Sequence, residues 1–282
     1  MDSAVSQVMN RRTLLRSALA LPAIVATGTQ AARQQTFIDC NVWIGEHPNR
    51  HLPWRDAAGL AVQLQRHGVT QAWACTFDAI LHRDFRSAND ELARQCTATS
   101  GLVRPVGAIN PTLPDWQQDL VHCAETHHMH AIRLLPGYHG YTLEDPRFQE
   151  LLNLAHQHGL LVQIAVQLED QRTQHPLLQV PDVDLKPLAK DARIMVLNAN
   201  ASHVLTGLRG KKAVIDTAFI EGVGGLESLL KSWPLEQLVF GTHSPWFYWE
   251  ANGLKLQESE LNADQSTAIR SGNALAICDS AR

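Results

Sequence analysis

Residues 147–166, RFQELLNLAHQHGLLVQIAV, contain the pattern that recurs along most of this 282-residue chain. Apolar residues first repeat at helical spacing over Arg147–His158. Gly159 then interrupts the pattern, and a run of apolar and β-branched residues follows over Leu161–Val166. A glycine directly after a helix is typical of a left-handed cap. The stretch therefore predicts a helix that leads straight into a strand, which is the repeating unit of parallel α/β folds.

The same alternation continues on both sides of this unit. Strands are expected at Thr36–Val42, Gln71–Phe77, Val103–Ile109, Ala131–Leu135, Leu161–Val166, Ile194–Leu197, Ala213–Asp216 and Leu238–Phe240. Helices are expected at Asp56–His67, Ser87–Thr99, Asp115–His127, Arg147–His158, Asp182–Asp191, Ser202–Leu208, Glu221–Ser232 and Ala263–Ser271. Eight such units predict a single (β/α)8 TIM-type barrel over residues 36–282. An open doubly wound sheet usually has fewer strands and a G-x-G-x-x-G turn after the first strand, and the chain has no such turn there.

Residues that end helices support these boundaries. Asp56, Ser87 and Asp115 are expected to cap the N-termini of three helices. Gly68 and Gly101 follow two helices and precede strands, as Gly159 does.

The first 31 residues predict a targeting segment, separate from the barrel. Asn10-Arg11-Arg12-Thr13-Leu14-Leu15-Arg16 is close to the twin-arginine consensus, and a short apolar stretch follows over Ser17–Thr27. Thr29-Gln30-Ala31 is a small-x-small cleavage candidate. The alternative is a frayed N-terminal tail that happens to contain arginines. We expect export to the periplasm by the twin-arginine route, with contact to the membrane only during transit.

Composition excludes two classes of partner. The formal net charge is −4, and neither a Lys/Arg cluster nor a basic stripe with interleaved aromatic residues is present. Nucleic acid and anionic membrane surfaces are therefore poor partners. The five cysteines form no C-x-x-C pair, so we expect buried small hydrophobes with at least one free thiol: Cys40, Cys75, Cys96, Cys123 and Cys278.

Four stretches resemble the amidohydrolase-related barrels, a family of metal-dependent hydrolases and decarboxylases. They are Phe37–Gly45 (FIDCNVWIG), Ile132–Tyr141 (IRLLPGYHGY), Phe240–Pro245 (FGTHSP) and Gly272-Asn273-Ala274. Together they are spread over nearly the whole chain after the targeting segment. The resemblance implies the barrel fold and a small organic acid or amide as substrate.

The residues that would bind the metal differ from the family pattern. The resemblance implies two histidines on the first strand, where the chain has Asn41 and Trp43. Ala165 stands at the expected histidine of the fifth strand, the sixth strand ends Leu197-Asn198-Ala199-Asn200, and His243 replaces the aspartate of the eighth strand. Zinc is the default metal of the family, but asparagine is a weak ligand and alanine and tryptophan are none. We therefore expect no metal cofactor at this site, with Trp43 filling the volume of the metal.

Polar residues nevertheless gather at the predicted barrel mouth. We expect His243 to act as acid or base with Asp39 or Asp170 as its partner carboxylate. Asn41 and Gln163 are expected to face the same cavity, and Arg133 is either an anion clamp or the partner of Asp39 or Glu169 in a salt bridge. Arg172 and His175 are further candidates for substrate binding in the loop after the fifth strand, where Asp170 and Arg172 can also simply pair with each other.

Two functions stay open at this point. One is an exported hydrolase or decarboxylase that works without the family's metal or with a rebuilt site. The other is a barrel that binds a ligand or serves as a scaffold without catalysis, and fold analogy alone does not separate them. Histidines on predicted helices, including His122 and His127, are expected to be solvated.

Overall fold

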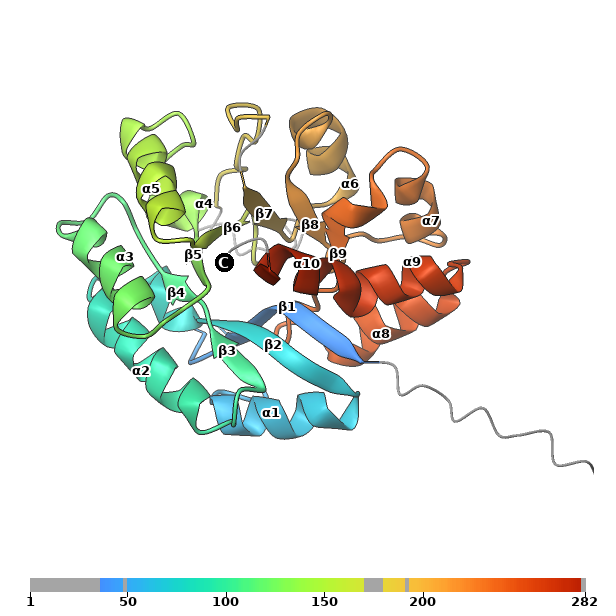
Figure 1. Cartoon of the computed structure of the whole chain (residues 1–282), viewed down its shortest axis with the longest axis horizontal. Helices are drawn as coiled ribbons and strands as arrows, with labels where there is room; N and C mark the ends of the chain where they lie inside the picture. Colours follow the sequence, from blue (N-terminus) through green and yellow to red (C-terminus); the bar gives the residue numbers. More distant parts are fainter. Residues whose placement is uncertain (1–35, 48–49, 170–179, 191–192, 280–282) are drawn as a thin grey trace, which may run out of the picture. The chain divides into compact units, whose positions relative to one another are not determined.

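The computed structural model describes residues 36–47, 50–169, 180–190 and 193–279, and all strands in this part of the chain are parallel. The strands are β1 Phe37–Ile44, β2 Val69–Thr76, β3 Val103–Pro105, β4 Gly107–Ala108, β5 Ala131–Leu134, β6 Leu161–Ala165, β7 Ile194–Leu197, β8 Val214–Asp216 and β9 Leu238–Val239. They form two sheets, of order β1-β2-β3 and β4-β5-β6-β7-β8-β9. Figure 1 shows them at the centre of the domain, with helices around them.

Two junctions join these sheets into a closed barrel. β3 and β4 are two pieces of one strand that Val106 interrupts, and Val106 still donates its backbone N–H to Ala74 O at 2.7 Å. On the other side, the chain beyond β9 runs along β1: Cys40 N bonds to Phe240 O at 2.9 Å and His243 N bonds to Asn41 O at 2.8 Å. The described strands therefore occupy eight positions around the barrel, as predicted.

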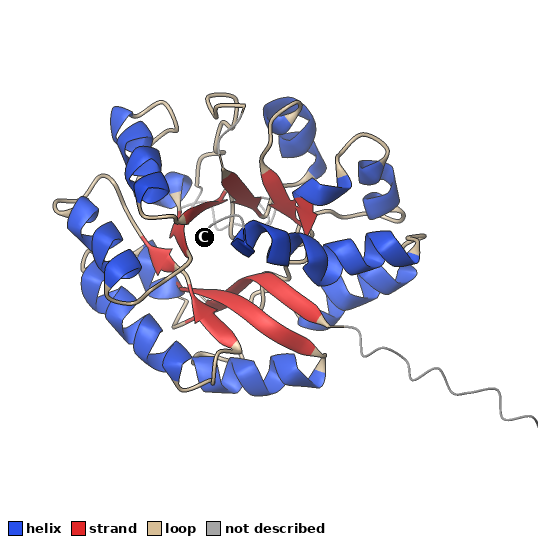
Figure 2. Cartoon of the chain, viewed as in Figure 1, coloured by secondary structure: helices blue, strands red, loops and turns tan. Residues whose placement is uncertain are grey.

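Most helices lie outside the strands, where Figure 2 shows them as an outer ring, whereas α10 lies near the centre of the view. The helices are α1 Ala57–Arg66, α2 Phe85–Thr97, α3 Trp116–Glu125, α4 Pro136–His139, α5 Pro146–Gln157, α6 Ala201–His203, α7 Gly225–Leu230, α8 Trp249–Glu258, α9 Ala263–Thr267 and α10 Asn273–Asp279. Within the described residues, no helix has the length and apolar character that a membrane span requires.

α10 covers the end of the barrel at which the strands begin. Asn273 donates to the carbonyls of Leu235 and Leu238 at 2.7 and 2.8 Å, just before and at the start of β9. Arg193, which precedes β7, donates to Ile277 O at 3.0 Å. The opposite end, where the strands finish, is therefore the end that remains for a site.

One expected helix is absent from the residues described, and two observed helices, α4 and α8, were not expected. The expected helix Asp182–Asp191 is wrong, because residues 182–190 form an irregular segment. The ammonium of Lys211 donates to the carbonyls of Leu185 and Leu188 in this segment, and Leu185 O also accepts from Leu188 N at 3.2 Å.

The predicted caps are confirmed in part. Asp56 caps α1 by accepting from Gly59 N, and Gly68 and Gly101 have the expected positive φ angles of 74° and 84°. The cap of α2 is Asp84 rather than Ser87, since the Asp84 carboxylate accepts from Ser87 N. Asp115 precedes α3 but makes no side-chain capping bond.

The cysteines follow the expectation. All five are free thiols, and four of them are buried in the hydrophobic cores. One core packs strand residues such as Val42 against helix residues such as Leu64. The other holds Cys40, Trp43 and Met195 together with Ala274 of α10.

Candidate functional site

The structure describes five of the residues predicted for the site, and all five are fully buried. Asp39 and Asn41 lie on β1, Arg133 on β5 and Gln163 on β6, and His243 follows β9. The other three predicted residues, Asp170, Arg172 and His175, lie outside the described residues.

His243 is held by hydrogen bonds at both ring nitrogens. Its Nε2 lies 2.8 Å from Leu168 O, a carbonyl that can only accept, so Nε2 carries the proton. Its Nδ1 accepts from Trp43 Nε1 at 3.0 Å and from Asn198 Nδ2 at 3.2 Å. Burial lowers the pKa of His243 to about 3, so the ring is neutral at physiological pH. A general base needs a nitrogen lone pair that faces the substrate, and here that lone pair already accepts from the protein.

Asn41 joins this histidine to a carboxylate that sequence reasoning did not single out. Its Nδ2 donates to Asn198 Oδ1 at 2.6 Å and to Asp216 Oδ2 at 2.7 Å. Its Oδ1 accepts from Trp43 Nε1 at 3.1 Å. Asp216 also accepts from Asn198 N at 2.8 Å, and burial raises its pKa. The sequence did contain a signal for these two residues: Asp216 ends the apolar run Val214–Asp216, and Asn198 directly follows β7.

Arg133 is not an anion clamp, nor does it form the expected salt bridge with Asp39 or Glu169. Its five hydrogen bonds end on neutral oxygens: Gln163 Oε1, Asn41 Oδ1 and the carbonyls of Val42, Cys40 and Trp73. The guanidinium also lies over the ring of Trp43, 4.5 Å from its centroid. Burial lowers its pKa to about 10, so Arg133 remains a cation at neutral pH. Its N–H groups therefore link β5 to β1, β2 and β6 inside the barrel.

Asp39 and Gln163 also have structural partners. Asp39 accepts from the hydroxyl and the backbone N–H of Thr242, at 2.6 and 3.0 Å, and so ties β1 to the segment beyond β9. Burial raises the pKa of Asp39 to about 7. Gln163 accepts from Arg133 and donates to Cys40 O at 3.2 Å. Asp39 is therefore not the carboxylate partner of His243 that the sequence predicted. His243 bonds to Trp43, Asn198 and Leu168.

This interior does not fit a divalent metal among the residues described. The one imidazole, His243, has both nitrogens engaged, and the Trp43 side chain extends between β1 and His243. The Arg133 cation, which lies over Trp43, would repel a second positive charge. Zinc sites need at least three protein ligands, and Asn41 and Asn198 are weak ones.

The backbone supports the same arrangement at two positions. Asn198 and His243 have φ angles of 61° and 59°, in the left-handed region that non-glycine residues seldom adopt. Such a conformation persists only where surrounding contacts fix it. The bonds of Asn198 to Gln167 O (2.6 Å) and of His243 to Asn41 O (2.8 Å) are contacts of that kind.

Further polar groups lie near the end of the barrel where the strands finish; Arg50 is exposed there, Glu169 is partly exposed and His47 is buried. His47 Nε2 is 3.9 Å from Glu169 Oε1, and the His47 ring meets Trp246 at a centroid distance of 4.4 Å. Arg50 is exposed and lies 4.6 Å above Trp246. Burial lowers the pKa of His47 to about 4 and raises that of Glu169, so the two do not form an ion pair at neutral pH. We call His47, Arg50, Glu169 and Trp246 the mouth group; the sequence placed only Glu169 among the candidates.

Comparison with solved structures shows that this fold is shared with known enzymes. In sequence, the chain matches no protein family and no curated protein that was searched. In structure, it is similar to 5-carboxyvanillate decarboxylase from Sphingomonas paucimobilis, with a TM-score of 0.68 at 11% identity over 87% of this chain and 99% of that one. It is also similar to dihydroxybenzoic acid decarboxylase from Polaromonas sp. JS666, whose structure contains manganese and the inhibitor 2-nitroresorcinol (TM-score 0.68, 10% identity, 88% and 98% covered).

A third similar structure comes from a Staphylococcus aureus protein provisionally assigned as an amidohydrolase (TM-score 0.64, 8% identity, 86% and 99% covered). The chain therefore has the barrel fold of these decarboxylases and of this amidohydrolase along nearly their whole length. At such low identities the likeness establishes the fold, and the residues of the site must carry any argument about activity.

Proposed function

We propose that this chain is an exported, divergent member of the amidohydrolase-related barrels that binds a small organic acid or amide at its mouth. In this proposal the interior supports the fold and carries out no metal-dependent chemistry. One observation carries this view of the interior: its polar side chains are fully buried and already have hydrogen-bond partners. They bond to one another and to nearby carbonyls, and they are His243, Asn41, Trp43, Asn198 and Arg133.

The ligand class follows from the mouth group and from the fold. Arg50 offers a guanidinium that can pair with a carboxylate, and it stands beside the aromatic face of Trp246. An exposed cation that lies over the ring of Trp246, which is itself buried, suits the carboxylate of a small organic acid. Two proteins with this fold act on aromatic acids, as their names state.

The proposal is tested by titrating the full chain with benzoate, 2,6-dihydroxybenzoate and benzamide. Isothermal titration calorimetry should show that at least one of them binds, with an affinity that EDTA does not change. Arg50→Gln should weaken binding of the acids by about tenfold, the expected scale for a lost charge-assisted hydrogen bond. Arg55→Gln is the matched control, because Arg55 lies on the same loop but pairs with Glu46 at 2.6 Å.

Release of carbon dioxide or ammonia is measured on the same samples. We expect neither above the blank. Turnover that EDTA abolishes would contradict the proposal, because it would require a metal centre. The absence of binding by all three compounds would contradict it as well.

A second candidate function is a metal-independent hydrolase or decarboxylase, and His47 is the observation that favours it. His47 is neutral at physiological pH and stands 3.9 Å from a carboxylate, which is the composition of an acid–base pair. Turnover that survives EDTA but disappears in His47→Gln would select this candidate over the first.

A further inference from the structure

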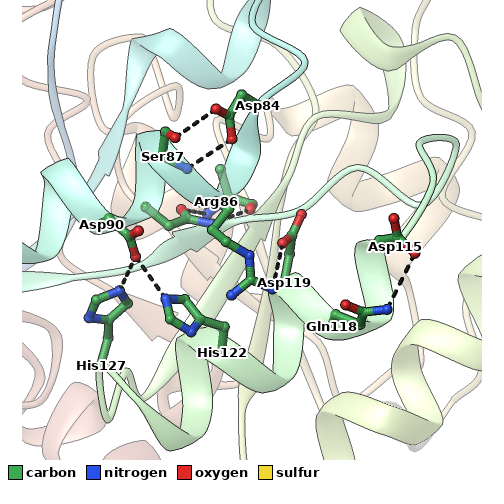
Figure 3. A network of polar contacts seen from close by, with 11 residues as sticks. Asp84, Arg86, Ser87, Asp90, Asp115, Gln118, Asp119, His122 and His127 are labelled. Carbon is green, nitrogen blue, oxygen red and sulfur yellow. Dashed lines mark hydrogen bonds and ion pairs between the residues drawn. The ribbon is translucent and has the colours of Figure 1, made fainter.

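A second group of potential ligand atoms lies on the outside of the barrel, far along the chain from the mouth group. Asp90 is in the middle of α2, His122 is in the last turn of α3, and His127 follows that helix. One oxygen, Asp90 Oδ1, lies 2.8 Å from His122 Nε2 and 2.6 Å from His127 Nε2. Figure 3 shows both imidazoles pointing at this carboxylate. The expectation that His122 and His127 are merely solvated is therefore wrong.

The three ligand atoms are close enough to surround one metal ion. They all lie within 4.8 Å of one another. In a tetrahedral zinc site with bonds of about 2.0–2.1 Å, ligand atoms are roughly 3.4 Å apart, so only small side-chain rotations separate the two arrangements. Two imidazoles and a carboxylate, with a water as fourth ligand, form a common zinc set. We propose that Asp90, His122 and His127 form a surface site for a zinc-class divalent transition metal.

The backbone holds the two histidines in place before any metal binds. Backbone N–H groups of Thr126 and His127 both bond to His122 O, at 3.0 and 3.3 Å. His128 then adopts a φ of 49°, and Met129 N bonds to Cys123 O at 3.0 Å. This turn fixes His127 beside the last turn of α3, and preorganisation of that kind lowers the entropy cost of binding.

Local charge favours a cation at this position. The C-terminal end of a helix carries partial negative charge, and His122 and His127 stand at the end of α3. Arg86, the nearest cation in Figure 3, is paired with Asp119 at 3.2 Å.

Metal ions can reach the site from solvent. The side chains of His122 and His127 are 21% and 17% exposed, and that of Asp90 is 48% exposed. His122 also lines a groove of about 520 Å³ between α3 and α5. The proposed site is independent of the mouth group and of the barrel interior.

The test measures zinc and cobalt binding to the full chain after any affinity tag has been removed. Isothermal titration calorimetry should give one zinc ion per chain, and Co²⁺ should give the visible absorption of a low-coordinate site. His122→Gln and His127→Gln should each weaken binding by at least about tenfold. Asp90→Asn should weaken binding too, although the amide oxygen can still accept a hydrogen bond.

The control is His67→Gln, which removes another surface histidine that pairs with a carboxylate, Glu250, at 3.1 Å. It should leave zinc affinity unchanged. Absence of stoichiometric binding would overturn the proposal, and so would binding that all three cluster variants leave intact. Circular dichroism of each variant at neutral pH verifies that it is folded, since none of the three side chains is in the core.

Discussion

At the scale of single residues, the barrel interior shows what the polar side chains do where the family's metal ligands are replaced. A polar group in an apolar interior costs free energy unless it finds a partner. Arg133 finds five partners, and His243 has partners at both nitrogens. Each of these residues therefore contributes to stability, and their removal should be visible in unfolding experiments rather than in ligand binding.

Arg133→Met provides the first prediction. The substitution leaves the carbonyls of Cys40, Val42 and Trp73 without this donor in a buried site. We expect the free energy of unfolding to fall by about 2–4 kcal/mol, since several buried oxygens lose a charged hydrogen-bond donor. Urea denaturation measures this. Arg147→Met is the control, because Arg147 bonds to Asp145 on the surface and should change stability by less than about 1 kcal/mol.

The pH dependence of stability provides a second prediction, at His243. Its pKa is about 3 in the folded chain and 6.5 for a free histidine side chain, so the unfolded chain takes up a proton that the folded chain refuses. Stability from this group is complete above pH 6.5 and is lost as the pH falls towards 3. By about pH 4 the loss should reach about 3 kcal/mol.

His243→Gln isolates that effect, because glutamine can still accept from Trp43 and donate to Leu168 but cannot titrate. The difference in unfolding free energy between the two proteins should therefore shift in favour of the variant between about pH 7 and about pH 4. Asp39 acts in the opposite direction, since its raised pKa of about 7 makes stability fall as the pH rises above its unfolded value of 3.8. It is present in both proteins and cancels in the comparison. A difference that stays constant with pH would contradict the assignment of His243 as a buried neutral group.

At the scale of elements, a side chain from a helix supports a short part of the barrel wall. β4 has only two residues, Gly107 and Ala108. Asn89 of α2 donates to Ala108 O at 2.9 Å and accepts from Ala108 N at 2.8 Å, as a neighbouring strand would do. The interruption at Val106 is thus compensated by α2.

Asn89→Leu should therefore lower the free energy of unfolding by about 2–4 kcal/mol, because it keeps the branching of the side chain but leaves a buried N–H and C=O of Ala108 without these bonds. Thermal and urea denaturation both measure the loss. Asn153→Leu, at an exposed position of α5, should be close to neutral. Equal stability of the two variants would show that Asn89 does not support β4.

The elements also show which parts of the fold the sequence could predict. Periodicity located the strands and most helices, because a buried strand or an amphipathic helix shows its own pattern. The expected helix at residues 182–191 failed partly because Pro187 lies in its interior, and partly because its carbonyls bond to Lys211, a long-range partner that leaves no local signal. Asp216 in the interior and the pairing of Asp90 with His122 and His127 were missed in the same way, since each depends on contacts between separate elements.

At the scale of the whole molecule, removal of the predicted targeting segment would change the net charge of the chain. Residues 1–31 contribute +2 to the net charge (Arg11, Arg12 and Arg16 against Asp2), so a chain cleaved after Ala31 would carry −4 − 2 = −6. A net charge of that size favours solubility. The barrel needs no partner strand at its edges, because the segment after β9 bonds to β1. Such a closed domain can fold on its own, which is compatible with the proposed twin-arginine route, because that route carries folded passengers.

Replacement of Arg11 and Arg12 by lysine is the prediction at this scale. The twin-arginine pathway reads the arginine pair itself, so Lys at both positions keeps the charge and removes the signal. Fractionation of a bacterial host should find the natural chain in the periplasm and the doubly substituted chain in the cytoplasm. Arg16→Lys, with the pair intact, should still be exported. Periplasmic accumulation of the doubly substituted chain at the natural level would show that these arginines are not the signal, and the chain would then have to reach its compartment by another route.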